Sequence, residues 1–285
     1  MNTIAILITS YNRKEKTIYC LKNLFHSPNQ EVYYTIKVYL VDDGSIDGTA
    51  SAIRKEFPEV IIIQGTGNLF WAGGMRLAWQ TAKDFDEYNY FLLLNDDTIL
   101  LPNKITDLIN SNKKCKAAMI KEGITIGTTI DAESGKITYG GRLLRNKFSP
   151  KSDKVFKDNV DMPCDLGNAN IMLVPKAIVD EIGILSTFFT HGLADFDYTL
   201  RAKQAGFWVL VAPFICGYCK NDHGKRWKSS DSTLKERIQF MHNPKGLAYH
   251  EYMNLLKTHF PYYLPVAFVK LWIKTLFPFL YDRFK

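Results

Sequence analysis

IAILITSYNR at residues 4–13 and IKVYLVDDGSIDGT at residues 36–49 decide the fold of this chain. Each stretch opens with a nearly continuous run of aliphatic and β-branched residues, which is typical of a strand covered on both faces of a parallel sheet. Each run then ends abruptly in polar residues. Residues 14–25 lie between the two stretches and carry apolar side chains at three- to four-residue spacing, which predicts a helix. This β-α-β order predicts an α/β fold with a mostly parallel, doubly wound sheet flanked by helices.

The same alternation continues along the chain. Further strands are expected at 60–63, 91–94, 171–174 and 208–211, and further helices at 47–57, 73–83, 176–182 and 195–205. Residues 120–161 are richer in Gly, Thr and Lys, and we expect them to leave the sheet as hairpins and loops. With 285 residues, the chain has room for one large α/β unit and a short appendage.

The composition is that of an ordinary globular protein. Hydrophobic residues make up 46% and charged residues 23%, which argues against a disordered chain and against a polytopic membrane protein. The net charge of +7 suits an acidic ligand or an anionic surface and by itself leaves nucleic acid open. The first residues lack a basic region and a small-residue cleavage site, so we expect a cytoplasmic protein.

The five cysteines are an odd number at irregular spacing, and we interpret them as reduced thiols. Cys216, Cys219 and His223 cluster in the sequence, but structural zinc usually takes four ligands, so a zinc site is not favoured.

Three of the expected strands end in polar residues. Residues 9–13 follow the first strand, Asp42 and Asp43 close the second, and residues 95–98 read NDDT after the fourth. An acidic turn that caps a helix would explain any one of them. Ligands of such sheets bind beyond the carboxyl ends of the strands, so three polar ends together favour a ligand site. The two carboxylates of Asp96 and Asp97 suit Mg²⁺ or Mn²⁺ bound together with phosphate oxygens.

At this point the chain resembles the family-two inverting glycosyltransferases, which have a GT-A type, Rossmann-like fold, and among them bacterial polysaccharide and O-antigen glycosyltransferases. The resemblance covers about residues 3–225. It rests on the order and spacing of TSYNR at 9–13, VDDGS at 41–45, GNLFWAGG at 67–74, NDD at 95–97 and ADFDY at 194–198, with Arg201 and Gly206 following.

The resemblance implies a catalytic domain over residues 1–225, with a nucleotide-sugar half at about 1–100 and an acceptor half at about 101–225. Residues 226–285 would form a C-terminal helical segment. The implied nucleotide-sugar-binding residues are Thr9, Tyr11, Arg13, Asp42, Asp43, Asn68, Trp71, Gly74, Arg76, Asn95 and Asp96.

Within this set the resemblance implies particular roles. Asp42 would read the base, and Asp96 would contact the ribose or the donor sugar. Asn95-Asp96-Asp97 matches the DxD-type motif, so Asp97 would bind the metal. His223 lies where several relatives have a metal-binding or phosphate-binding histidine, although a loop histidine is often incidental. Arg76 either contacts the diphosphate or is an exposed helix cation with Trp71 as core packing.

Asp195 matches the carboxylate that serves as general base in this family. It would deprotonate an acceptor hydroxyl that attacks the anomeric carbon opposite the diphosphate, and this single displacement inverts the configuration. The alternative is a carboxylate that only stabilises a helix N-terminus. Ala194 stands where the family usually has Glu. Asp197 either compensates for that loss or caps and orients the helix.

The tail, residues 261–281, is apolar and aromatic, with Lys270 and Lys274 one helical turn apart. Two lysines and three prolines make it a poor membrane-spanning helix. The pattern instead suits an amphipathic segment that lies in the headgroup region of a membrane. The alternatives are packing on the catalytic domain or in a homodimer interface. A membrane seat would place the enzyme on the cytoplasmic face of the inner membrane, near a lipid-linked glycan acceptor.

We therefore expect a hexosyltransferase-type enzyme that uses a nucleotide-diphosphate sugar and Mn²⁺ or Mg²⁺, with no nucleic acid among its partners. A sugar-phosphate nucleotidyltransferase is the first alternative, but residues 9–13 lack the Gly- and basic-rich phosphate loop it needs. A non-catalytic glycan- or nucleotide-binding scaffold is the second, suggested by Ala194. A dinucleotide oxidoreductase is disfavoured because no G-x-G-x-x-G follows the first strand.

Overall fold

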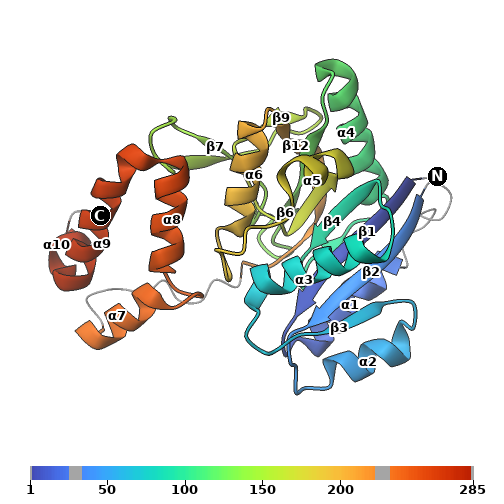
Figure 1. Ribbon diagram of the computed structural model, residues 1–285, viewed down its shortest axis with the longest axis horizontal. Coiled ribbons are helices and arrows are strands. Elements are labelled where there is room, and N and C mark those ends of the chain that lie inside the picture. The colour runs from blue at the N-terminus through green and yellow to red at the C-terminus, as the bar shows by residue number, and fades with distance from the viewer. Residues whose placement is uncertain (1, 26–33, 222–231, 284–285) are drawn as a thin grey trace.

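A computed structural model of the chain describes residues 2–25, 34–221 and 232–283. In the described residues, the main sheet has the strand order β3-β2-β1-β4-β11-β6-β12-β5, and β9 pairs with β12. Helices cover both faces of this sheet (Figure 1).

The first hundred residues form the regular, parallel part of the sheet. Its strands are β1 (Asn2–Ser10), β2 (Tyr34–Asp42), β3 (Ile61–Gln64) and β4 (Tyr90–Leu94), all parallel to one another. The helices that connect them are α1 (Lys14–Phe25), α2 (Thr49–Glu56) and α3 (Phe70–Phe85). The expected helix at 14–25 agrees with α1 at both ends, and the α/β fold with a mostly parallel sheet is confirmed.

The second half of the sheet is mixed. β11 (Ile171–Pro175) runs antiparallel to both β4 and β6 (Gly123–Ile130), while β12 (Trp208–Tyr218) runs parallel to β6. Its short outer strands are β5 (Ile99–Leu100) and β9 (Met162–Pro163). Its helices are α4 (Lys104–Met119), α5 (Lys176–Ile182) and α6 (Ala194–Gln204).

The expectation that residues 120–161 leave the sheet is wrong for β6. This strand lies inside the sheet between β11 and β12 and is buried from Gly123 to Thr129. Its glycines reflect close packing, because a Cβ on Gly127 would lie 2.7 Å from Cγ2 of Ile171. β7 (Gly141–Leu144) and β8 (Ser152–Val155) form one of the expected hairpins, in a small sheet with β10 (Leu166–Gly167). An antiparallel bridge between Ile130 and Ile137 closes a second, shorter turn.

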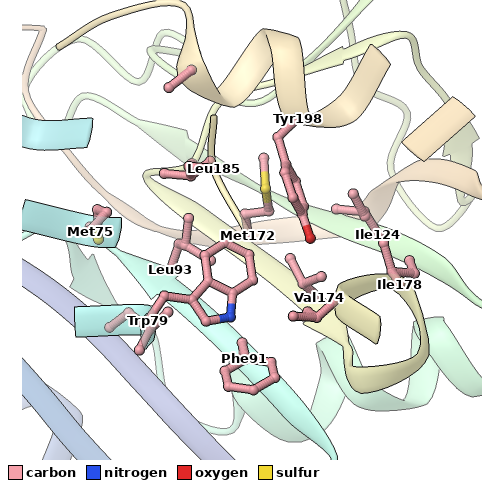
Figure 2. Packing of buried hydrophobic residues seen from close by; sticks show 14 of the residues in the cluster. Met75, Trp79, Phe91, Leu93, Ile124, Met172, Val174, Ile178, Leu185 and Tyr198 are labelled. Carbon is pink, nitrogen blue, oxygen red and sulfur yellow. The ribbon is translucent and has the colours of Figure 1, made fainter. Parts of the chain in front are cut away.

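The core has two layers because alternate residues of each strand face opposite sides of the sheet. In β1, Ala5 and Leu7 face the layer under α3 and α6, whereas Ile4, Ile6 and Ile8 face α1 and α4. Figure 2 shows the first layer around Trp79. The indole of Trp79 lies 5.6 Å from the ring of Phe91 and 5.3 Å from that of Tyr198, which joins α3, β4 and α6 in one packed layer.

The C-terminal helices lie beside α6, on the left of Figure 1. They are α7 (Leu234–His242), α8 (Tyr249–His259), α9 (Leu264–Leu276) and α10 (Pro278–Arg283), with a 3₁₀ turn at Pro261–Tyr263. A third apolar cluster joins α8 and α9 to Leu166 and Leu200. Among the described residues, no helix has the length and apolar character that crossing a membrane requires.

Candidate active site

The structure brings the three polar strand ends together at one edge of the sheet. β1 lies between β2 and β4, with Ser10 opposite Asp42. Nη1 of Arg13 lies 3.2 Å from Oδ1 of Asp96 and 2.8 Å from Oδ2 of Asp97, so the first and third strand ends form an ion-pair cluster. The backbone N–H of Asn12 donates to Oγ of Ser45 at 2.9 Å, which joins the first end to the second.

Asp43 holds the loop that leads into α3. Its Oδ1 accepts a hydrogen bond from the backbone N–H of Gly67 at 2.8 Å, and its Oδ2 accepts from Leu69 and Phe70 at 2.9 and 3.1 Å. The side chain is buried, with 3% exposure. Three charge-assisted hydrogen bonds make this carboxylate the organiser of the loop. Direct contact between Asp43 and a nucleotide stays a prediction.

Asp42 is also buried, and its Oδ1 accepts from the backbone N–H of Ser45 at 3.1 Å. It therefore stabilises the sharp turn that follows β2, where Gly44 has a φ of 78°. The predicted reading of the base by Asp42 is not tested by these contacts. Tyr11 is half exposed at the same edge, and Asn68 is exposed in the loop before α3.

Gly74 and Trp71 bring α3 against this edge. A Cβ on Gly74 would lie 2.1 Å from Oγ1 of Thr9, so only glycine lets the helix approach the end of β1. The indole N–H of Trp71 donates to Oδ1 of Asn95 at 2.8 Å, which links α3 to the end of β4. Trp71 also packs against the core, so it combines the packing role with a polar contact at the site.

The carboxylates of Asp96 and Asp97 have different surroundings. Asp96 is 5% exposed, and burial raises its pKa to about 6, with Arg13 opposing the rise and the neighbouring Asp97 adding to it. Oδ1 of Asp97 lies 3.6 Å from Sγ of Cys219. Burial and the charge of Asp97 raise the pKa of Cys219 to about 12, so Cys219 is a neutral thiol at neutral pH.

This acidic pair fits a hard divalent cation that is shared with a ligand. Mg²⁺ is usually held by one or two carboxylates together with substrate phosphates. Within the described ranges, no group of three or more His, Cys, Asp or Glu side chains could hold a metal alone. Cys216 and Cys219 are free, buried thiols. His223, the second expected metal ligand, lies outside the described residues.

Asp195 lies in the first turn of α6. Its Oδ1 accepts from the backbone N–H of Phe196 at 2.9 Å, while its Oδ2 lies 3.3 Å from the N of Ala169 and 3.4 Å from Nδ2 of Asn168. Burial raises the pKa of Asp195 above the ordinary aspartate value, and these hydrogen bonds oppose the rise. A carboxylate with a raised pKa is a stronger base than an ordinary aspartate, which suits it to accept a proton.

Residues 168–170 connect Asp195 to the acidic pair. They precede β11, the strand that pairs with β4, and the carbonyl of Asn170 accepts from the N–H of Asn95 at 3.1 Å. The amide of Asn170 also lies 3.5 Å from Sγ of Cys219. The two halves of the site therefore meet through one short segment, although Asp195 lies about a hundred positions after Asp97.

The structure bears on the alternatives given above for Arg76 and Asp197. Arg76 is half-buried rather than an exposed helix cation, because its Nη1 donates to the carbonyls of Ser186 and Phe189 at 2.8 and 2.6 Å. Its contact with a diphosphate stays a prediction. Asp197 is 4% exposed, and its two oxygens face His259 and Arg201. These contacts favour the alternative in which Asp197 orients α6, and Ala194 is itself buried in the core.

Comparison with known families identifies the chain. Residues 5–165, more than half of the chain, match the model of glycosyl transferase family 2. The chain belongs to this family. Membership decides in favour of the expected glycosyltransferase over the nucleotidyltransferase alternative. No curated protein sequence matches the chain.

Solved structures show the same GT-A fold. A mannosyltransferase from Pyrobaculum calidifontis, in complex with GDP-Man and Mn²⁺, is 15% identical with a TM-score of 0.54, covering 95% of this chain and 74% of that one. TarS (residues 1–349) of S. aureus is 13% identical with a TM-score of 0.52, covering 90% and 72%. GalNAc-T7 with UDP, GalNAc and Mn²⁺ is 12% identical with a TM-score of 0.58, covering 76% and 42%. At these identities the likeness establishes the fold alone.

Proposed function

We propose that this glycosyltransferase is an inverting enzyme that moves one sugar from a nucleoside-diphosphate donor to a glycan acceptor. The observation that carries the proposal is the junction of the Asp96–Asp97 pair with Asp195 through residues 168–170. An acidic pair at a strand end suits a cation with a diphosphate, and a buried carboxylate nearby suits a base. The complexes of the similar structures with GDP-Man or with UDP and Mn²⁺ support this donor class and this metal.

On the donor side, the residues of the sheet edge bind and orient the nucleotide. Asp97, with Asp96 beside it, would hold Mn²⁺ or Mg²⁺, whose chemistry when bound is to neutralise the charge that develops on the departing diphosphate. Arg13 adds a permanent positive charge against the same two carboxylates. Asp43 keeps the 67–70 loop in place through its three hydrogen bonds.

On the acceptor side, Asp195 takes the proton. As the acceptor oxygen forms its bond to the anomeric carbon, the bond from that carbon to the diphosphate oxygen breaks, and the hydroxyl proton moves to Asp195. Attack and departure on opposite faces invert the configuration. The hydrogen bonds from Phe196, Ala169 and Asn168 hold the carboxylate in place for this transfer.

A donor screen tests the proposal. The protein is heated with a panel of nucleotide sugars and Mn²⁺, and a donor that binds the folded state raises the apparent melting temperature. We expect one donor to stabilise the wild type and the control Asp158→Asn, which removes an exposed carboxylate, but not Asp97→Ala. Stabilisation that survives in Asp97→Ala would contradict the metal role of that residue.

The stabilising donor is then used to separate an enzyme from the scaffold suggested by Ala194. We expect slow, Mn²⁺-stimulated hydrolysis of the donor without acceptor, and none with Asp97→Ala. Binding without hydrolysis, and without transfer to any offered glycan, would favour the scaffold.

The acceptor is proposed to be lipid-linked because the tail presents an apolar surface. Phe268, Val269 and Phe279 are 49%, 52% and 65% exposed, while Lys270 and Lys274 stand among them. Exposed aromatic and aliphatic side chains with nearby lysines suit a seat among anionic headgroups. This seat would place the enzyme on the cytoplasmic face of the inner membrane.

Vesicle binding tests this seat. We expect cosedimentation with phosphatidylglycerol-containing vesicles and less with pure phosphatidylcholine. Val269→Glu should weaken binding about 10- to 100-fold, since burial of one such side chain contributes about 1.5–3 kcal/mol and each 1.4 kcal/mol is about tenfold. Ile120→Glu, at an exposed apolar position directly after α4, is the control. If vesicles do not bind and Val269→Glu instead dissociates a dimer, the surface is a homodimer interface.

A further inference from the structure

One face of α8 contacts the elements that carry the active site. Glu251, Leu255 and His259 follow at four-residue spacing, so they lie on the same side of the helix. Leu255 is buried in the core cluster that contains Ala194. Glu251 at one end of this face and the side chain of His259 at the other end are buried as well. The function proposed above uses neither residue.

His259 bonds to the helix that carries Asp195. Its side chain is 1% exposed, and its Nε2 lies 2.9 Å from Oδ1 of Asp197. Its Nδ1 lies 3.1 Å from Nε2 of Gln204, at the other end of α6. Since an amide NH₂ can only donate, Nδ1 accepts from Gln204, and the N–H at Nε2 donates to Oδ1 of Asp197.

Asp197 also contacts Arg201, which in turn binds the segment before α6. Its Oδ2 accepts from Nε of Arg201 at 2.9 Å, and the same guanidinium donates to the carbonyls of Ile182 and Ile184 at 2.8 and 2.9 Å. His259 therefore completes a network that fixes α6 against both α5 and α8. The pair joins residues 62 positions apart.

Glu251 reaches the same region from the other end of α8. It is 8% exposed, and its charge acts on Arg76, where it favours the charged guanidinium against the burial that lowers the pKa of Arg76. Arg76 in turn holds the carbonyls of Ser186 and Phe189, in the loop that leads to α6. The contacts of Arg76 thus hold part of the loop before α6, and Glu251 favours the charged form of that guanidinium.

We propose that His259 is a positioning residue for Asp195. Through Asp197 it fixes the rotation of α6, so that the carboxylate two residues earlier keeps its place against Ala169 and Asn168. Those two contacts are long, at 3.3 and 3.4 Å, so a small rotation of the helix breaks them. The C-terminal helices are thus part of the catalytic unit. The inference rests on the function proposed above for Asp195.

Three variants test it. His259→Phe keeps a ring and removes the N–H, His259→Gln keeps an amide donor near the place of Nε2, and Lys257→Ala changes an exposed residue of the same helix. Since a misplacement of about 1 Å can cost about 10²-fold in rate, we expect His259→Phe to lower kcat about 10- to 100-fold. The Kd for the donor, measured by titration, should not change. His259→Gln should recover most of the rate, and Lys257→Ala should match the wild type.

Hydrogen exchange supplies a readout that does not depend on activity. In His259→Phe, the amides of the 186–193 loop and of the first turn of α6 should exchange faster than in the wild type, while those of β1 and β2 should not. His259→Gln should stay close to the wild type. If the wild type transfers no sugar, the proposed function fails, yet the exchange result still decides whether His259 holds α6.

Two results would overturn the inference. The first is an unchanged kcat and unchanged exchange in His259→Phe. The second is an equal loss in the Phe and Gln variants with a matching loss of donor affinity, which would mean general damage to the fold. His259→Asn, whose amide stops short of the position of Nε2, provides a second removal of the bond and should behave like His259→Phe.

Discussion

The donor edge and the base helix are held in different ways. At the donor edge, Asp43 accepts its hydrogen bonds from a loop 24 to 27 residues away, and Asp42 from a residue three positions away. The base helix depends on a histidine of the C-terminal segment, 62 positions beyond Asp197. The turn after β2 and the loop before α3 are thus held by partners within 27 positions, whereas the helix that carries Asp195 is held in addition by a partner from the C-terminal segment.

The largest effect that distinguishes the two regions should come from Asp195→Asn. The amide keeps the shape of the side chain but cannot take a proton, so we expect transfer to fall by about 10²–10⁴-fold. Donor affinity should stay at the wild-type value, because the donor edge is built without this residue. Stopped transfer assays and donor titration measure the two quantities. A parallel loss of donor affinity would show that the two regions are not separable.

Asp43→Ala should damage the other region. It removes three hydrogen bonds to a buried carboxylate and leaves the 67–70 loop without its organiser. We expect the free energy of unfolding to fall by about 2–4 kcal/mol. Urea denaturation measures this loss, with the exposed Asp158→Asn as control, and donor affinity should fall with it. Unchanged stability would mean that the loop is held by other contacts.

Asp96→Asn should have the smallest effect, and it should raise the free energy of unfolding rather than lower it. The folded protein raises the pKa of Asp96 from 3.8 to about 6, so the folded state binds this proton more tightly than the unfolded state. Stability from this group is therefore present below about pH 4 and is lost as the pH rises through about 6. One pKa unit corresponds to about 1.4 kcal/mol, so the variant should be more stable at pH 7 by about 1–3 kcal/mol.

Denaturation at two pH values checks this sign. At pH 4, where Asp96 is already protonated in the folded protein, the advantage of the amide should shrink. A variant that is less stable than the wild type at pH 7 would show that the pair with Arg13 outweighs the cost of burial. The donor edge would then be stabilised by its own charges rather than strained by them.

The sequence predicted the donor edge because its signals are local. Apolar runs that end in polar residues define β1, β2 and β4, and the spacing of 14–25 defines α1. Their parallel order alone brings the strand ends together. The contacts among these residues could not be predicted in the same way. Asp43, for example, holds a loop more than twenty residues away, and its role depends on the path of that loop.

The prediction failed where packing overrides composition. The Gly and Thr content of β6 suggests a loop, but Gly127 is needed because Ile171 packs directly against it, and Thr125, Thr128 and Thr129 are buried in the sheet. Antiparallel β11 was likewise not distinguished from a parallel strand, because both types of buried strand are continuous apolar runs.

No sequence pattern marks His259 as a partner of Asp197. A single histidine near the end of a helix has no characteristic spacing to a carboxylate 62 positions earlier, and only the packing of α8 on α6 brings the two together. The boundary expected at 225/226 stays a prediction. The buried face of α8 nevertheless packs the segment that follows this boundary against α6, the helix that carries Asp195.

The anomeric configuration of the product tests the central claim most directly. A donor that stabilises the protein is turned over with its acceptor, and the coupling constant of the new anomeric proton is compared with that of the donor by NMR. Single displacement with Asp195 as base predicts the opposite configuration in the product. A product with the configuration of the donor would contradict the account.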